Sequence, residues 1–226
     1  DIITLDTAEV FEFSVAEITG NTYDRLIGYD PEDVSKIFGV AAESWTVSDD
    51  GKTFTFKMRK GIKFASGNEM TAEDAAFSLQ RAIVLNKSPA FILSQFGFSA
   101  DNVKDMIKAV DADTLTITTD KAYAPTFVLY CLTATIASIV DKTEVMKHEV
   151  DGDMGNSWLN ANSAGSGPFA IQTYRPGELI RLSANDSYFM GEPGVESIIV
   201  RHVAEAHDMA YVLLRYFNVA GADPAG

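Results

Sequence analysis

Histidine and serine are the side chains that could bind a metal or act as nucleophiles here, but neither has the spacing that such chemistry needs. His148, His202 and His207 are scattered along the chain and form no HExxH or HxH motif. We therefore expect surface or core histidines and no metal site. The stretch Gly165–Pro168 is not the GxSxG elbow of a serine hydrolase, and Pro168 has no backbone N–H for an oxyanion. A structural turn is the better interpretation.

The acidic pairs and the cysteine also have structural explanations. Asp49-Asp50 precedes a glycine in a turn, and Glu73-Asp74 falls in the first turn of a predicted helix, where carboxylates interact favourably with the helix dipole. Cys131 is the only cysteine, so no disulfide within the chain is possible. Its apolar surroundings favour a buried, unreactive thiol. We predict no catalytic residue, no enzyme activity and no cofactor, and a binding protein fits this absence best.

Composition narrows the class of protein further. With 226 residues, 46% hydrophobic and 22% charged, the chain is expected to fold into one or two globular units. Its net charge of −14, without a run of Lys or Arg, argues against nucleic acids and anionic membrane surfaces as partners. The uncharged segment between Lys121 and Asp141 approaches the ~20 residues of a membrane span. Because it contains Pro125 and several hydroxyl groups, we predict a buried core helix over 124–140 instead.

Several elements follow from local patterns. Trp45 and Val47 alternate ahead of an Asp50-Gly51 turn with two positive-φ positions, and residues 53–58 alternate in the next strand. Phe54, Phe56 and Met58 are expected on the buried face of that strand. Other predictions are an extended start over 1–15, a helix over 15–30, a helix over 68–86 capped by Thr71 and Asp74, a short helix near 99–107, a strand at 113–120, a mainly loop stretch over 141–167, a hairpin around Arg175–Glu178 and a strand at 195–203.

Taken in order, these segments resemble the peptide/nickel family of solute-binding proteins that serve ABC transporters. The likeness covers about residues 1–204. The stretches that carry it are Leu5-Asp6-Thr7, Tyr23-Asp24-Arg25-Leu26, Ala42-Glu43-Ser44-Trp45 through Phe64, Thr71-Ala72-Glu73-Asp74 through Ser78, Gly167-Pro168-Phe169, Pro176-Gly177 and Asn185 through Gly191.

This resemblance implies an α/β (mixed α+β) fold, a type II periplasmic-binding-protein-like lobe with an extra subdomain, and a second lobe missing. Residues 1–40 and 150–204 would form the main part of lobe one, and 41–149 the extra subdomain. The 45–64 hairpin would then lie in a small sheet beside a larger mixed one. Carried over by position, the ligand-binding residues would be Phe11, Glu12 and Phe13 at the edge of lobe one, with Ala90 and Phe91 on the subdomain rim. For the three phenylalanines, ordinary core packing is an equal alternative.

The resemblance also implies partners and a location. The ligand would be a small solute, a peptide first of all, and the partner an ABC permease. We expect a monomeric periplasmic protein. The chain opens at Asp1, so we expect that a signal was removed or the sequence trimmed. The identity of the solute and the mode of membrane anchoring are not encoded in these residues.

The last residues break the pattern. Residues 205–226 form an atypical tail, and about 210–226 resemble a strand and turn of NAD-dependent nucleotide-sugar epimerases. No GxxGxxG and no YxxxK motif accompanies them, so epimerase activity is not supported. A junction near Ala206 or chance likeness in a truncated binding protein are the two explanations. A fragment or fusion related to an epimerase, and an interaction module without a small ligand, remain the alternative functions.

Overall fold

The computed structural model describes residues 2–203 and 211–216. The helices are α1 Phe13–Thr22, α2 Ala72–Leu85, α3 Phe91–Ser94, α4 Val103–Met106, α5 Pro125–Cys131, α6 Lys142–Met146 and α7 Asn156–Leu159, with 3₁₀ turns at Ser88–Ala90 and Thr135–Ala137. The strands are β1 Ile27–Tyr29, β2 Ile37–Gly39, β3 Ala42–Val47, β4 Thr53–Met58, β5 Ile107–Asp111, β6 Thr114–Thr118, β7 Phe169–Arg175, β8 Leu179–Ala184, β9 Ser197–Val203 and β10 Tyr211–Tyr216.

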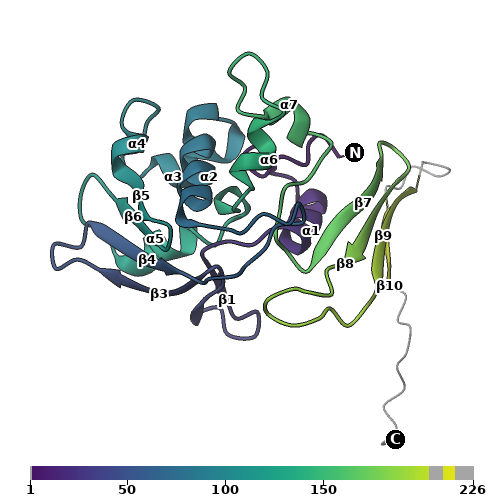
Figure 1. Cartoon of the computed structure of the whole chain (residues 1–226), viewed down its shortest axis with the longest axis horizontal. Helices are drawn as coiled ribbons and strands as arrows, with labels where there is room; N and C mark the ends of the chain where they lie inside the picture. Colours follow the sequence, from purple (N-terminus) through teal and green to yellow (C-terminus); the bar gives the residue numbers. More distant parts are fainter. Residues whose placement is uncertain (1, 204–210, 217–226) are drawn as a thin grey trace, which may run out of the picture.

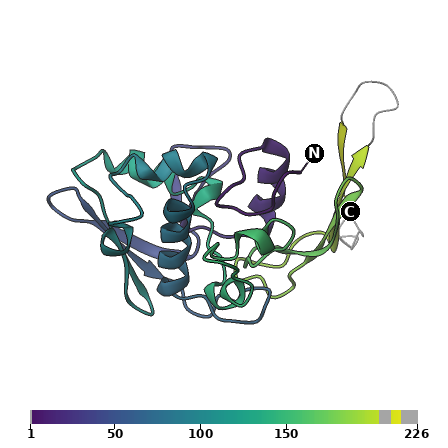
Figure 2. The ribbon, with the colours of Figure 1, turned by 90° about the horizontal axis from the view of Figure 1, so that it is seen from above.

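Two four-stranded sheets lie at opposite ends of the described structure, with α1 between them (Figures 1 and 2). Their strand orders are β3-β4-β6-β5 and β10-β9-β8-β7, and every neighbouring pair is antiparallel. A short β1-β2 pair forms a third, smaller sheet. The mixture of helices and sheets confirms the predicted fold class. The prediction of a larger mixed sheet was wrong for the described strands, because the second sheet is built from antiparallel hairpins.

The first sheet follows the predicted hairpin closely. Phe54 and Phe56 are fully buried, and Met58 lies on the same face of β4. Leu115 and Ile117 of β6 are likewise buried. One detail of the turn was wrong, because only Gly51 has a positive φ, at 70°. Asp50 instead uses its side chain, which accepts hydrogen bonds from the Ser48 hydroxyl and the Lys52 N–H.

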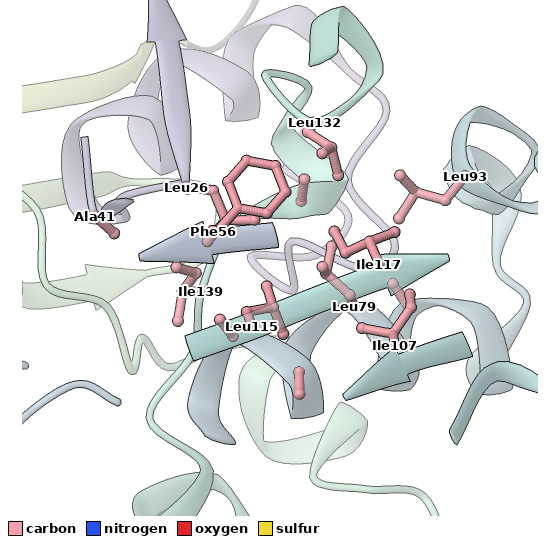
Figure 3. Packing of buried hydrophobic residues seen from close by; sticks show 14 of the residues in the cluster. Leu26, Ala41, Phe56, Leu79, Leu93, Ile107, Leu115, Ile117, Leu132 and Ile139 are labelled. Atoms are coloured by element: carbon pink, nitrogen blue, oxygen red, sulfur yellow. The ribbon is translucent and has the colours of Figure 1, made fainter. Parts of the chain in front are cut away.

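Helix α2 begins where the sequence predicted. The Thr71 hydroxyl accepts from the Glu73 N–H at 3.2 Å, and Asp74 accepts from the Thr71 N–H at 2.9 Å, which completes a capping box. The helix packs against β5 and β6. Figure 3 shows Leu79 of α2 beside Ile107 and Ile117 in the core of this part of the molecule.

The helix predicted over 15–30 was wrong in its second half. Helix α1 ends at Thr22, and β1 begins at Ile27. The side chains that suggested one helix belong to three separate buried clusters: Val15 and Ile18 to one, Tyr23 to a second and Leu26 to a third. Because a single short helix cannot direct one stripe into three cores, the chain becomes extended at Tyr23.

The core helix predicted over 124–140 was also wrong. Helix α5 ends at Cys131, and the chain is extended at Ala134, with φ −70° and ψ 155°, before one 3₁₀ turn. The carbonyl of Thr133 accepts a hydrogen bond from the Arg25 side chain at 2.9 Å. Burial is nevertheless as expected, since Leu132, Ile136 and Ile139 all lie in the core. None of the described helices could cross a membrane.

The remaining predictions fared better. Strands β7 and β8 form the predicted hairpin, closed by a hydrogen bond from the Glu178 N–H to the Arg175 carbonyl. The 141–167 stretch is mainly loop but contains α6 and α7. The Cys131 thiol is only partly buried, whereas a buried thiol was predicted, and this partial burial still raises its pKa. Residues 205–210 and 217–226 of the predicted tail lie outside the described residues, while Tyr211–Tyr216 pairs with β9 as β10.

Candidate ligand-binding site

Two phenylalanines far apart in the sequence meet at the surface. Phe11 precedes α1 and Phe91 begins α3, and their ring centroids lie 6.0 Å apart with an angle of 80° between the planes. Each residue is 58% exposed. Phe13, at the start of α1, is 94% exposed. We call these three residues, Phe11, Phe13 and Phe91, the aromatic rim.

Exposure of the aromatic rim has an energetic cost. A phenylalanine left in water forgoes about 2 kcal/mol of burial free energy. Scattered exposed apolar residues are normal, whereas a group of them is typical of a binding surface. The alternative that Phe11, Phe13 and Phe91 are ordinary core residues was therefore wrong. Their contact with a ligand stays a prediction.

The other two predicted ligand residues lie next to the aromatic rim. Glu12 is the residue before α1, with φ −88° and ψ 138°, and its side chain does not cap the helix. Its Oε2 accepts only a 3.3 Å hydrogen bond from the Phe11 N–H. Ala90 is 1% exposed and packs in the core, so only its main chain could touch a ligand. For both residues, ligand contact stays a prediction.

A buried ion pair positions the two halves of the aromatic rim. Arg81 of α2 donates to both carboxylate oxygens of Asp6, at 2.8 and 2.5 Å, and both side chains are buried. Asp6 lies five residues before Phe11, and Arg81 lies ten residues before Phe91. The pair thus joins the segment that leads into α1 to the helix that leads into α3.

The ion pair is embedded in a fully hydrogen-bonded network. Asp6 also accepts from the Ala8 N–H at 3.0 Å and from the Asn156 side chain at 2.7 Å. The third donor of Arg81, its Nε, binds the Met154 carbonyl at 2.8 Å. A buried charge is tolerated only when it is paired and hydrogen-bonded in this way. The network therefore fixes the 6–10 segment, α2 and the loop before α7 against one another.

Short segments connect the Asp6–Arg81 network to the aromatic rim. The carbonyl of Asp6 accepts from the N–H groups of Glu9 and Val10, both at 2.9 Å. Beyond α2, Asn86 adopts a left-handed conformation with φ 47°, which ends the helix and turns the chain toward α3. The Lys87 Nζ lies 3.5 Å from Glu9 Oε2, so a salt bridge also joins the two segments. The segment that carries Phe11 and the segment that carries Phe91 are thus both held close to the Asp6–Arg81 network.

Sequence reasoning missed the Asp6–Arg81 pair. Asp6 entered it only as part of the Leu5-Asp6-Thr7 stretch. The sequence did indicate that Arg81 needs an acidic partner, because it lies within an apolar stretch of a capped helix, where a lone charge must be paired when buried. The sequence could not indicate which of its 32 acidic residues that partner would be.

Comparison with known proteins places the chain in a family. Residues 36–215 match the family described as bacterial extracellular solute-binding proteins, family 5. The chain belongs to this family. Its type II periplasmic-binding-protein architecture is shared with solved structures.

Individual relatives agree with this assignment. The probable D,D-dipeptide-binding periplasmic protein DdpA of Escherichia coli K12 is 30% identical over 207 residues, which cover 90% of this chain and 38% of DdpA. The glutathione-binding protein GsiB of Shigella flexneri is 28% identical, with 93% of this chain and 38% of GsiB covered. The periplasmic binding protein DppA of Helicobacter pylori, in complex with the peptide STSA, gives a TM-score of 0.70 at 27% identity, with 88% and 40% covered.

The chain therefore spans little more than a third of the length of these relatives. The predicted junction near Ala206 lies inside the range that matches the family and stays a prediction. The epimerase likeness has no observation in its favour among the described residues.

Proposed function

We propose that this chain provides one face of the binding cleft in the solute-binding component of an ABC importer, and that the solute is a peptide. The observation that carries the proposal is the aromatic rim. Phe11 and Phe91 come from segments 80 residues apart, meet edge to face in solvent and are held by a buried network. Family membership indicates a solute-binding protein, and the names of the relatives given above refer to peptides or glutathione.

The chemistry of the rim suits a peptide. The chain is extended at Glu12, so backbone groups next to Phe11 could pair with a peptide main chain, while the rings contact its side chains. The Glu12 carboxylate could meet a cationic group of the ligand. Because one open face buries far less of a ligand than an enclosed cleft does, we expect millimolar affinity for residues 1–226 alone.

The experiment is a titration of the isotope-labelled chain with the tetrapeptide Ser-Thr-Ser-Ala, followed through backbone amide NMR shifts. We expect the largest shifts at Phe11, Glu12 and Phe91. Phe91→Ala should weaken binding at least about fivefold, since a buried aromatic contact contributes roughly 1 kcal/mol or more. Val110→Ala, at an exposed apolar residue on β5, serves as the control and should leave binding unchanged.

Three results would count against this proposal. Shifts confined to residues outside the rim would remove Phe11 and Phe91 from the site. No shift at tens of millimolar peptide would remove peptides as ligands of this face. Micromolar affinity would contradict the expectation that this face holds the ligand only weakly.

The two-part organisation is proposed with the function. Residues 41–149 would form the extra subdomain, and 1–40 with 150–204 the main part of lobe one. The clusters of buried residues support this, since α1 packs with β7, β8 and β9, while α2 packs with β4, β5 and β6. Leu26 and Ile27 belong to the 1–40 part but pack in the core around α2, so the two parts share an interface.

We propose the location and the partner of this chain from its membership of the solute-binding proteins. The relatives DdpA and DppA are named as periplasmic proteins, and we propose the same location for this chain, acting as a monomer with an ABC permease. The net charge of −14 supports neither a nucleic acid nor an anionic membrane as a further partner.

A further inference from the structure

A second cleft lies at the other end of α1 from the aromatic rim. It has a volume of about 350 Å³ and is bounded by the last residues of α1, the β1-β2 pair and the segment after β8. The side chains important here are Arg25, Tyr29, Phe38, Tyr188 and Met190. A cleft of this size falls in the range of small-molecule sites, which begins at roughly 300 Å³.

The guanidinium of Arg25 is the one strongly basic group in this cleft wall. It is half-buried, and burial lowers its pKa, as expected for a cation that has lost part of its hydration. Its Nη1 donates to the Thr133 carbonyl at 2.9 Å. No carboxylate among the described residues lies within ion-pair distance of it.

Arg25 lines the cleft and has donors that no described residue uses. Within the described part of the chain, no fully buried side-chain nitrogen lacks a hydrogen-bond partner, so the nitrogens of Arg25 that have none are not fully buried. A guanidinium presents its N–H groups in a fork that matches both oxygens of a carboxylate. Arg25 is therefore arranged to receive an anion from the cleft side.

The neighbouring acid does not occupy this position. Asp24 is 4% exposed, and its carboxylate accepts from the Tyr188 hydroxyl and the Ser166 hydroxyl, both at 2.7 Å. Burial raises the pKa of Asp24 in spite of these bonds. With each oxygen bound to a hydroxyl, Asp24 fixes Tyr188 in the cleft wall and leaves the open side of Arg25 to a ligand.

The rest of the cleft is apolar at its mouth. Tyr29, Phe38 and Met190 are 45%, 41% and 51% exposed, which is unusual for large apolar side chains gathered at one opening. Gly28 allows the Phe38 ring to pack closely against the backbone, since an added Cβ would lie 3.2 Å from that ring. An apolar body with about the width of a ring could contact these residues while a charged end reaches Arg25.

We propose that this cleft is a second ligand site, distinct from the aromatic rim, for a small organic carboxylate with an aromatic or branched apolar body. Arg25 binds the carboxylate, and Tyr29, Phe38 and Met190 cover the apolar part. The site shares no residue with the proposed peptide contacts, so either proposal can fail without the other.

The test is calorimetric and NMR titration of the chain with phenylacetate. We expect millimolar binding, with amide shifts at Arg25, Tyr29 and Phe38. Phenylacetamide, which has the same shape without the charge, should bind at least about tenfold more weakly, because a hydrogen bond to a charged group contributes more than a neutral one. Inorganic phosphate should also bind more weakly, because it has no apolar body.

Variants assign the effect to the cleft. Arg25→Gln should reduce phenylacetate affinity about tenfold or more, while the matched Arg175→Gln, at an arginine side chain 65% exposed in the β7-β8 turn, should have no effect. Arg25 also binds the Thr133 carbonyl, so Arg25→Gln could unfold the chain. Met190→Asp, at a 51% exposed position, keeps the test valid by placing a repelling charge at the mouth.

Phe91→Ala should leave phenylacetate binding unchanged, which separates this site from the aromatic rim. The proposal is overturned if Met190→Asp binds phenylacetate as well as the parent chain does, or if folded Arg25→Gln does. Equal binding of phenylacetate and phenylacetamide would remove the carboxylate from the argument. Equal binding of phosphate would remove the apolar body.

Discussion

Replacing Arg81 by methionine tests the network that positions the aromatic rim. Methionine has a similar length and fits a core, so the change removes the charge and three hydrogen bonds with little loss of volume. Asp6 would then be a buried carboxylate that keeps only the Ala8 N–H and the Asn156 side chain as close partners.

The expected cost is large because both partners are buried. Removing one partner of a buried ion pair destabilises a protein by about 3–5 kcal/mol, since the other charge is left without compensation. The whole stability of a domain is only about 5–15 kcal/mol. For a chain of this size, each kcal/mol lowers the melting temperature by roughly 2–4 °C, so Arg81→Met should melt about 6–20 °C below the parent chain.

The assay is urea unfolding followed by circular dichroism, with thermal melting in parallel. Lys60→Met is the matched control, because Lys60 pairs with Asp113 at 2.7 Å but its side chain is 77% exposed. A surface pair of this kind contributes about 0–1 kcal/mol. The double variant Asp6→Asn with Arg81→Met should lose less than the sum of the single variants, since it leaves no lone buried charge. A loss below about 1 kcal/mol for Arg81→Met would refute the reasoning.

Three further predictions rest on single contacts. Asp24→Asn should flatten part of the pH dependence of stability. Burial raises the pKa of Asp24, so its stabilising contribution is fully present below the ordinary carboxylate pKa and is lost as pH rises through the raised value. Urea midpoints in which the variant gains nothing relative to the parent as pH rises above the ordinary carboxylate pKa would contradict this. Gly165→Ala should unfold the chain or cost more than about 3 kcal/mol, because the new Cβ would lie 1.9 Å from the Thr22 carbonyl oxygen, whereas Gly194→Ala meets nothing within 4 Å and should melt like the parent; equal melting of the two variants would be the adverse result. Thr71→Ala should cost about 1 kcal/mol in urea unfolding through loss of the α2 cap, and an unchanged midpoint would argue against the capping box.

The elements that the sequence predicted well are those whose signals are local. The β3-β4 hairpin combines strict alternation with a Gly51 turn, and α2 combines a capping box with an apolar stripe. These patterns involve residues within a few positions of one another, so no distant contact is needed to interpret them.

The predictions that failed concern apolar segments whose partners are distant. The stretch over 124–140 is buried as expected but not helical throughout, because burial alone does not distinguish a helix from an irregular buried segment. For the helix predicted over 15–30, the sequence showed apolar spacing but not the three different cores that receive Val15, Tyr23 and Leu26.

The candidate site was predicted in part. The resemblance pointed to both segments of the aromatic rim, and the structure brings Phe11 and Phe91 together. It did not show that Ala90 is buried, nor that Asp6 and Arg81 fix the geometry. A contact between residues 75 positions apart leaves no periodic pattern in the sequence. The Asp6–Arg81 pair and the burial of Ala90 are therefore visible only in the structure.

The network around Asp6 also has a consequence for the order in which the chain assembles. Leu5 donates to the Asn160 carbonyl, and Asp6 binds Arg81 and Asn156, so the distant partners of these residues come from two later parts of the sequence. During synthesis from the amino end, the contact with Arg81 can form early, but the network around Asp6 cannot be completed until Asn156 and Asn160 have emerged. Contacts of such long sequence separation form slowly, because a large loop must close first. The face that we propose meets the solute would thus be among the last parts of the molecule to mature.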